Sequence, residues 1–132
     1  MMDTLKRYKI LVVDNNETYL DVFRFKLKDL IAGAIDCIDE AYHGLHAIEL
    51  IQDKTYDVVF MDVDMPVLDG VDTTKFLRLR YPDLKIIALS HDNNKEHLNA
   101  MIHAGASEYL AKDNLDDNAL LKIFRDLDVS LP

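Results

Sequence analysis

The sequence predicts a single α/β domain built on a doubly wound parallel sheet. The prediction depends on three observations: the chain has 132 residues, strand-like and helix-like segments alternate five times, and residues 58–61 are continuously apolar. A chain of this length suits one domain. A short, fully apolar run is typical of a strand covered on both faces, and its alternation with helices implies right-handed crossovers and a parallel sheet.

Five segments have the pattern of β-strands. The run at 58–61, Val-Val-Phe-Met, is short and apolar enough to be buried on both faces. Polar residues interrupt the segment 34–41, which favours a place at the edge of the sheet. The predicted strands are 8–13, 34–41, 57–61, 85–89 and 108–111.

Five segments have the pattern of helices. The first is capped by Asn15 or Asn16 and ends at Gly33, and its apolar residues Leu20, Phe23, Leu27 and Leu30 recur at helical spacing. The third has Asp69 as its N-cap and stops before Pro82. The other predicted helices are 45–52, 94–104, closed by Gly105, and about 116–127.

Composition excludes several classes of function. The 24 acidic and 15 basic residues give a net charge of −9, which argues against binding of nucleic acid or an anionic membrane by this domain. No apolar run approaches the roughly 20 residues that cross a bilayer, and the N-terminal residues lack the apolar core of a signal peptide. The single cysteine, Cys37, leaves no internal disulfide, so the expected compartment is a reducing cytoplasm.

Polar side chains follow four of the predicted strands. Open α/β sheets bind ligands at the carboxyl ends of their strands, and these ends carry Asp14, Asn15, Asp62, Asp64, Ser90 and Lys112. Oxygen ligands from the three aspartates and Asn15 suit Mg²⁺, with Mn²⁺ as an alternative. A nucleophilic carboxylate, a divalent ion, the Ser90 hydroxyl and the Lys112 ammonium together indicate a phosphoryl-transfer site.

Four motifs resemble the receiver domain of two-component response regulators. They are Ile-Leu-Val-Val-Asp at 10–14, the Asp62 segment with Met65-Pro66 and Asp69-Gly70, Ile-Ile-Ala-Leu-Ser at 86–90 and Gly-Ala-Ser-Glu-Tyr-Leu-Ala-Lys at 105–112. The resemblance covers essentially the whole chain. The ending at 109–113 is most similar to receivers joined to LuxR-type DNA-binding domains.

The resemblance implies a flavodoxin-like (βα)5 fold with strand order 2-1-3-4-5. It implies that residues 1–132 form one receiver (response regulatory) domain, with no output domain in this chain. Asp62 would be the phosphoacceptor, and Asp14, Asn15, Asp62 and the Asp64 carbonyl would hold Mg²⁺. Ser90 and Lys112 would bind the phosphoryl group, and Tyr109 would be the aromatic switch residue that turns inward with Ser90; a plain core role for Tyr109 is the alternative.

The implied function is a phosphorylatable signalling switch that catalyses only its own phosphorylation and dephosphorylation. Its partner would be a sensor histidine kinase or a phosphotransfer protein. Phosphorylation would shift the face formed by the fourth helix, fifth strand and fifth helix, which also offers a surface for a homodimer. Neither direct nucleic-acid binding nor membrane binding is expected of this domain.

Two residues depart from the receiver pattern. Asn15 stands where receivers usually carry a second acidic residue, so Mg²⁺ should bind more weakly. His91 follows the switch hydroxyl, where a small residue is usual; it would either narrow access to Asp62, bringing a group that titrates near neutral pH, or point into solvent. These departures leave open a pseudo-receiver that signals without phosphate. A third alternative is a haloacid-dehalogenase-type phosphatase, because Asp62-Val63-Asp64 has the form of its DxD motif.

Overall fold

Five parallel strands form one sheet in the computed structural model, which describes residues 6–65, 68–91 and 95–129. The strand order is β2-β1-β3-β4-β5, as the resemblance implied. The strands are β1 (Tyr8–Val13), β2 (Ile35–Ala41), β3 (Val58–Asp62), β4 (Ile86–Ser90) and β5 (Glu108–Ala111). The helices are α1 (Glu17–Ile31), α2 (Gly44–Asp53), α3 (Gly70–Arg80), α4 (Lys95–Ala104) and α5 (Asp117–Val129).

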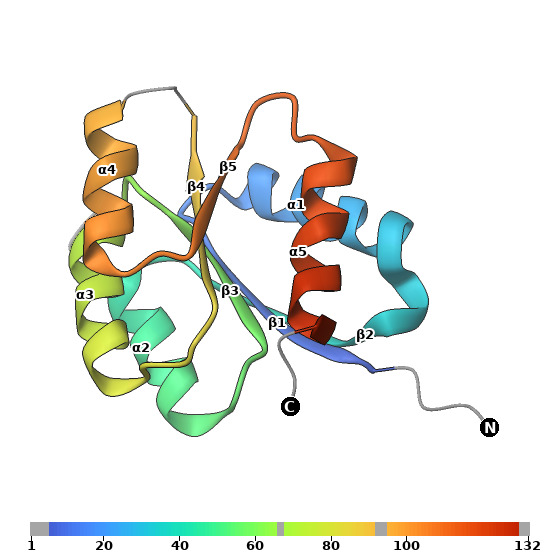
Figure 1. Ribbon diagram of the computed structural model, residues 1–132, viewed down its shortest axis with the longest axis horizontal. Coiled ribbons are helices and arrows are strands. Elements are labelled where there is room, and N and C mark those ends of the chain that lie inside the picture. Colours follow the sequence, from blue (N-terminus) through green and yellow to red (C-terminus); the bar gives the residue numbers. More distant parts are fainter. Residues whose placement is uncertain (1–5, 66–67, 92–94, 130–132) are drawn as a thin grey trace.

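Helices cover both faces of the sheet. Helices α1 and α5 lie on one face, and α2, α3 and α4 lie on the other (Figure 1). Alternate residues of each central strand therefore enter two separate cores: Phe60 packs with Phe23 of α1, their ring centres 4.9 Å apart, while Val59 and Met61 pack in the opposite core. All five residues of β3 are buried, which explains its continuous apolar sequence.

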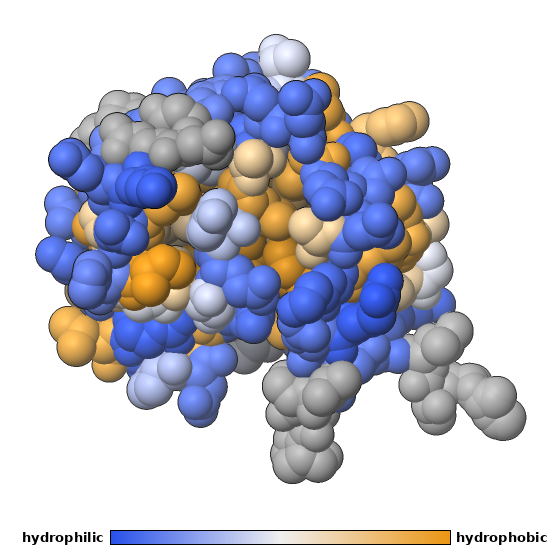
Figure 2. All heavy atoms as spheres, turned by 45° about the horizontal axis from the view of Figure 1, so that its top comes forward, coloured by the Kyte–Doolittle hydropathy of each residue, from blue (hydrophilic) through white to orange (hydrophobic). Residues whose placement is uncertain are grey.

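The position of β2 agrees with its sequence pattern. β2 lies at one edge, as its polar interruptions indicated, and most of its residues are only half buried. Hydrophobic side chains form a central strip between hydrophilic flanks in Figure 2. Ile102 of α4 and Tyr109 of β5 are among the large hydrophobic residues exposed to solvent.

Within the described parts of the chain, no helix combines the length and the apolar character needed to cross a membrane.

The helix ends agree with the predicted caps, with small corrections at the boundaries. The side chain of Asn16, rather than Asn15, caps α1 by accepting from the Tyr19 amide at 3.1 Å. Helix α1 ends at Ile31, before Gly33, because a short 3₁₀ turn at Ala32–Ala34 follows it. Asp62 and Ser90 are the last residues of their strands rather than the first residues beyond them. The predicted helix start at Asn94 and Pro66 of the Met-Pro motif lie outside the described residues.

Gly70 allows the start of α3 to pack directly on the end of β3. A Cβ atom at this position would lie 2.1 Å from the Asp62 carbonyl oxygen and 2.9 Å from the Val63 Cα. The Gly70 amide donates a 2.9 Å hydrogen bond to the Val63 carbonyl, and Asp69 caps the helix by accepting from the Asp72 amide. The Asp-Gly pair therefore fixes the backbone that carries Asp62.

Substitution of Gly70 tests this close approach. We expect Gly70→Ala to lower the free energy of unfolding by about 2 kcal/mol or more, because the new methyl group meets rigid backbone atoms. Gly33→Ala is the matched control, since a Cβ there meets nothing within 4 Å. Urea denaturation of both variants measures the difference, and equal stabilities would contradict the packing described here.

Candidate functional site

Strand register brings the predicted polar residues to one edge of the sheet. Val13 pairs with Met61, so Asp14 emerges beside Asp62. Ser90 pairs with Ala111 in the neighbouring strands, and the Lys112 amide donates to the Ser90 carbonyl at 2.8 Å. Asp14, Asp62, Ser90 and Lys112 thus come from four adjacent strand ends and are all buried.

A lysine shared by two carboxylates forms the centre of this site. The Lys112 Nζ atom lies 2.5 Å from Asp14 Oδ2 and 3.5 Å from Asp62 Oδ1. Asp14 is 0% exposed and Asp62 is 5% exposed. The second oxygen of Asp14 accepts from the Asn16 amide at 2.9 Å. One ammonium group therefore faces two buried carboxylates, which leaves an excess of negative charge.

Burial and charge change the acidity of Asp62. Burial is the larger cause and the nearby Asp14 carboxylate is the next, and together they raise the pKa of Asp62 from 3.8 to about 6. Lys112 opposes this rise. The carboxylate of Asp62 is therefore ionised above about pH 6 but held in surroundings that favour binding of a cation.

The donor atoms at the site suit a small divalent ion. Among the residues described, no three His, Cys, Asp or Glu side chains are grouped closely enough to hold a metal by themselves. The carboxylate of Asp64 is exposed, as is Asn15, so the protein offers two buried carboxylates and additional amide or carbonyl oxygens. Mg²⁺ is commonly bound by one or two carboxylates while it keeps several waters, and the excess negative charge at Asp14 and Asp62 fits this requirement.

Two other residues that the sequence singled out, Tyr109 and His91, are exposed to solvent. Tyr109 is 52% exposed, so the alternative that placed it in the core is wrong for this structure. The side chain of His91 is 63% exposed, and its Nδ1 atom lies 3.5 Å from Asp113 Oδ1. His91 therefore contacts the loop after β5 and is largely exposed to solvent.

Sequence reasoning missed Tyr19, in the first turn of α1. Its ring centre lies 4.3 Å from the Lys112 Nζ atom. Asn16 caps the helix at the Tyr19 amide, and the Tyr19 ring packs 5.9 Å from that of Phe23 one turn later. The sequence did indicate where Tyr19 would lie. Helix α1 begins at Glu17, three residues after Asp14, so its first turn has to lie near the edge of the sheet that carries the site.

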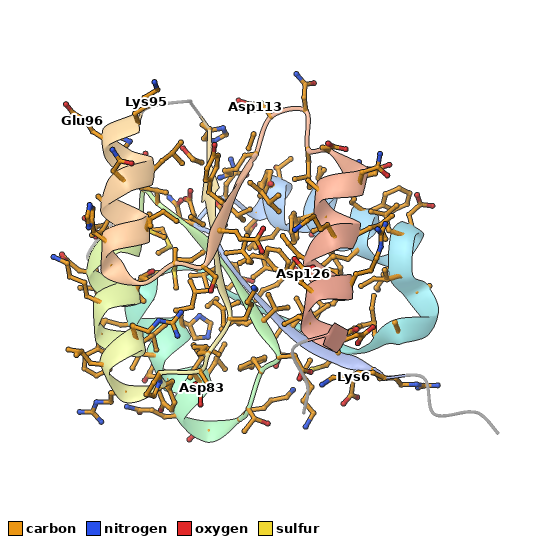
Figure 3. All side chains as sticks on the ribbon, in the orientation of Figure 1. Lys6, Asp83, Lys95, Glu96, Asp113 and Asp126 are labelled. Atoms are coloured by element: carbon orange, nitrogen blue, oxygen red, sulfur yellow. The ribbon has the colours of Figure 1, made fainter. Side chains whose placement is uncertain are left out.

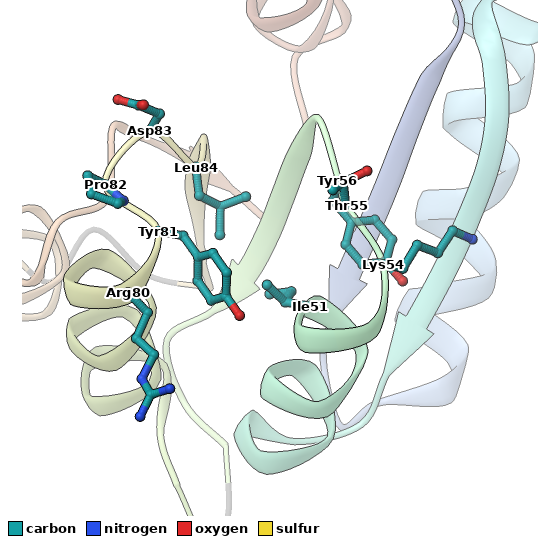
Figure 4. A pocket seen from close by; sticks show the side chains of 9 residues that line it. All are labelled: Ile51, Lys54, Thr55, Tyr56, Arg80, Tyr81, Pro82, Asp83 and Leu84. Carbon is teal, nitrogen blue, oxygen red and sulfur yellow. The ribbon is translucent and has the colours of Figure 1, made fainter.

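The largest cavities described do not coincide with this site. Asp113, Lys95 and Glu96 lie toward the edge that carries the site, whereas Asp83 lies toward the opposite edge (Figure 3). A cavity of about 390 Å³ at that opposite edge has Ile51 and Tyr81 among its walls (Figure 4).

The basic residues of this cavity already have partners. Lys54 binds Asp39 at 2.8 Å, and Arg80 stacks over Phe76. Because these cations already have partners, the buried cluster at Asp62 remains the candidate functional site.

Comparison with known proteins agrees with the geometry. The family model for the response regulator receiver domain matches residues 10–125. The chain is 30% identical over 118 residues to the transcriptional regulatory protein DegU of Brevibacillus brevis, covering 88% of this chain and 48% of DegU. It is 36% identical over 109 residues to the two-component response regulator ORR41 of Oryza sativa, covering 81% of this chain and 84% of ORR41.

A solved structure with the same fold contains a magnesium ion. The receiver domain of the sensor histidine kinase PA1611 from Pseudomonas aeruginosa, described with a magnesium ion in its active-site cleft, superimposes with a TM-score of 0.81 at 26% identity. The alignment covers 94% of this chain and 99% of that one. The DegU match is consistent with the expected similarity to receivers of LuxR-type regulators. The chain spans about half the length of DegU.

The raised pKa of Asp62 predicts a pH-dependent stability without divalent ions. A folded-state pKa above the unfolded value means that stability is lost as pH rises from about 4 to about 6. We expect Asp62→Asn to raise the free energy of unfolding by roughly 2–3 kcal/mol at neutral pH. This gain should disappear below about pH 4, where the carboxyl group is protonated in both states.

Urea titrations across this pH range, with a chelator present, measure the effect. Asp83→Asn removes a carboxylate that is exposed at the opposite edge, so its stability difference should be small and independent of pH. A gain for Asp62→Asn that stayed constant from acid to neutral pH would contradict the raised pKa.

Proposed function

Because the chain belongs to the response regulator receiver domain family, whose members are signalling switches of two-component systems, we propose that Asp62 is its phosphoacceptor. The observation that carries this proposal is the buried cluster of Asp62, Asp14 and Lys112, with Lys112 in contact with both carboxylates. Phosphorylation would be the only reaction that the domain performs on itself, together with its reversal by water.

Asp62 acts as the nucleophile in this proposal. One of its oxygens forms the new bond to phosphorus, and the bond between phosphorus and the donor's leaving group breaks with its electron pair on the leaving group. The pKa of about 6 leaves the carboxylate ionised at neutral pH, so no base is needed. The strand end holds Asp62 in place because Gly70 packs against its carbonyl group.

The neighbouring residues compensate the added charge. An aspartyl phosphate brings a compact group with almost two negative charges into an acidic crevice. Lys112 supplies a cation, and the hydroxyl of Ser90, at the end of the adjacent strand, supplies a donor to a phosphoryl oxygen. Asp14, Asp62, Asn15 and the Asp64 carbonyl would hold Mg²⁺, with Mn²⁺ as a substitute, and the ion would neutralise charge on the transferring group.

The proposed output is a shift of the surface formed by α4, β5 and α5. Ser90 would move toward the phosphoryl group, and Tyr109, exposed in this structure, would turn inward into the space released. A preference of a few kcal/mol is enough to invert a two-state population. The exposed Ile102 on α4 and Tyr109 on β5 offer this surface to a second copy of the domain.

We propose a sensor histidine kinase or a phosphotransfer protein of the cytoplasm as the phosphoryl donor. The match to the receiver domain of a sensor kinase supports this class of partner. The net charge of −9 argues against direct contact between this domain and nucleic acid.

Phosphorylation can be measured by intact mass. With acetyl phosphate and Mg²⁺, the wild-type protein should gain the mass of one phosphoryl group. Asp62→Asn should gain none, because the nucleophile is lost, whereas Asp83→Asn should behave as the wild type. An unmodified wild-type protein, under conditions that label a standard receiver, would contradict the proposal and favour a pseudo-receiver.

Asn15 provides a test of the metal site. Asn15→Asp adds one negative charge to the ligand set, so we expect the affinity for Mg²⁺ to rise by about tenfold in calorimetric titrations. Asn16→Asp is the matched control: it adds the same charge one residue later, where the side chain caps α1, and its effect should be much smaller. Equal affinities for Asn15→Asp and the wild type would remove Asn15 from the ligand set.

A further inference from the structure

We propose that Tyr19 is a positioning residue for Lys112: its ring holds the ammonium group in the crevice while Lys112 changes from one anionic partner to another. The inference rests on the proposed function of the site. It assigns a role to a residue that neither the motifs nor the resemblance singled out.

The contact between Lys112 and Tyr19 differs from the other lysine–tyrosine contacts described. The Nζ atom lies 4.3 Å from the ring centre of Tyr19, whereas Lys6 and Lys54 lie 5.8 Å and 5.7 Å from the rings of Tyr8 and Tyr56. The side chain of Lys112 is only 2% exposed, compared with 30% for Lys6 and 40% for Lys54. A cation over an aromatic ring is held more strongly when it is removed from water.

The ring suits a lysine that has to change its contacts. In the unphosphorylated protein Lys112 is closest to Asp14, which belongs to the proposed metal site. After phosphorylation Lys112 has to bind the phosphoryl group on Asp62. Hydrogen bonds to carboxylates are lost during such a move, but the face of a ring attracts a cation over a broad area. Tyr19 therefore keeps an attractive contact with the ammonium group in both positions.

The hydroxyl group of Tyr19 stays protonated, so the side chain carries no charge. The oxygen is buried and has no hydrogen-bond partner among the described residues. Burial, followed by the charges of Asp14, Asp62 and Asp113, raises the pKa of Tyr19 well above its usual value. The side chain therefore stays uncharged and does not compete with the carboxylates as an anion. Its contribution to Lys112 comes from the ring.

An adjacent cavity shows what the ring prevents. A cavity of about 240 Å³ lies next to the site, and its walls include Tyr19, Val22, Lys112 and Asn114. Lys112 already forms part of the wall, and without the ring this space would open around its ammonium group and admit water to it. Lys26, which also lines the cavity, is bound to Asp117 at 2.6 Å. Removal of the ring would thus give Lys112 hydrated positions away from Asp62.

Three variants distinguish the effect of the Tyr19 ring from the effect of its hydroxyl and from the effect of the cavity wall at Val22. With acetyl phosphate at saturating Mg²⁺, Tyr19→Leu should be phosphorylated about tenfold more slowly than the wild type, whereas Tyr19→Phe and Val22→Ala should stay within about twofold. The affinity for Mg²⁺ should change little in all three, because Tyr19 supplies no metal ligand. A wild-type rate in Tyr19→Leu, or a rate in Tyr19→Phe as low as in Tyr19→Leu, would overturn the proposal.

A second measurement needs neither phosphorylation nor a folded Tyr19→Leu variant. In NMR spectra of the unphosphorylated wild type, the ε-methylene protons of Lys112 should be shifted upfield from those of the other lysines by the Tyr19 ring. Ordinary lysine shifts would overturn the proposal. If the upfield shift is present but acetyl phosphate leaves the wild type unmodified, the proposed function fails and the positioning of Lys112 by Tyr19 stands.

Discussion

The site depends on one ammonium group held between two buried carboxylates. Lys112 lies 2.5 Å from Asp14 and 3.5 Å from Asp62, and a single positive charge does not neutralise both. Without a divalent ion, burial and, after it, the uncompensated charge of Asp14 raise the pKa of Asp62 and disfavour its ionised form. The same imbalance makes the crevice attractive to a divalent ion, so the feature that costs stability in the free protein prepares the site for its chemistry.

The fold maintains this arrangement through backbone contacts at the ends of the strands. The Lys112 amide is bound to the Ser90 carbonyl, so the proposed cation and the proposed switch hydroxyl are connected. Gly70 brings the start of α3 onto the Asp62 carbonyl, and the cap of α1 at Asn16 orients Tyr19. The charged atoms are thus held by rigid elements, while His91 and Tyr109 at the surface are exposed. This combination suits a chemical centre that stays fixed while the surface around it changes conformation.

Much of the fold and the position of the site could be predicted from particular residues. The apolar run at 58–61 predicted the central strand, and parallel strands place Asp14, Asp62, Ser90 and Lys112 at one edge whatever their separation in sequence. No motif carried the Tyr19 contact: the start of α1 after β1 places Tyr19 near this edge, but its position over Lys112 depends on how the first turn of α1 packs against the residue that follows β5. The exposure of Tyr109 is equally a property of packing, since alternation in a strand of four residues does not determine which side is covered.

In the proposed mechanism, Lys112 leaves Asp14 and binds the phosphoryl group when Asp62 is phosphorylated. A crystal structure with Mg²⁺ and beryllofluoride, an analogue of the phosphoryl group, would show both partners of Lys112 at once. We expect beryllofluoride on Asp62, the ion on Asp14 and Asp62, and the Lys112 Nζ atom bound to fluorine while still over the Tyr19 ring. A structure in which Lys112 stays bound to Asp14, or leaves the ring for solvent while Asp62 carries the analogue, would contradict it.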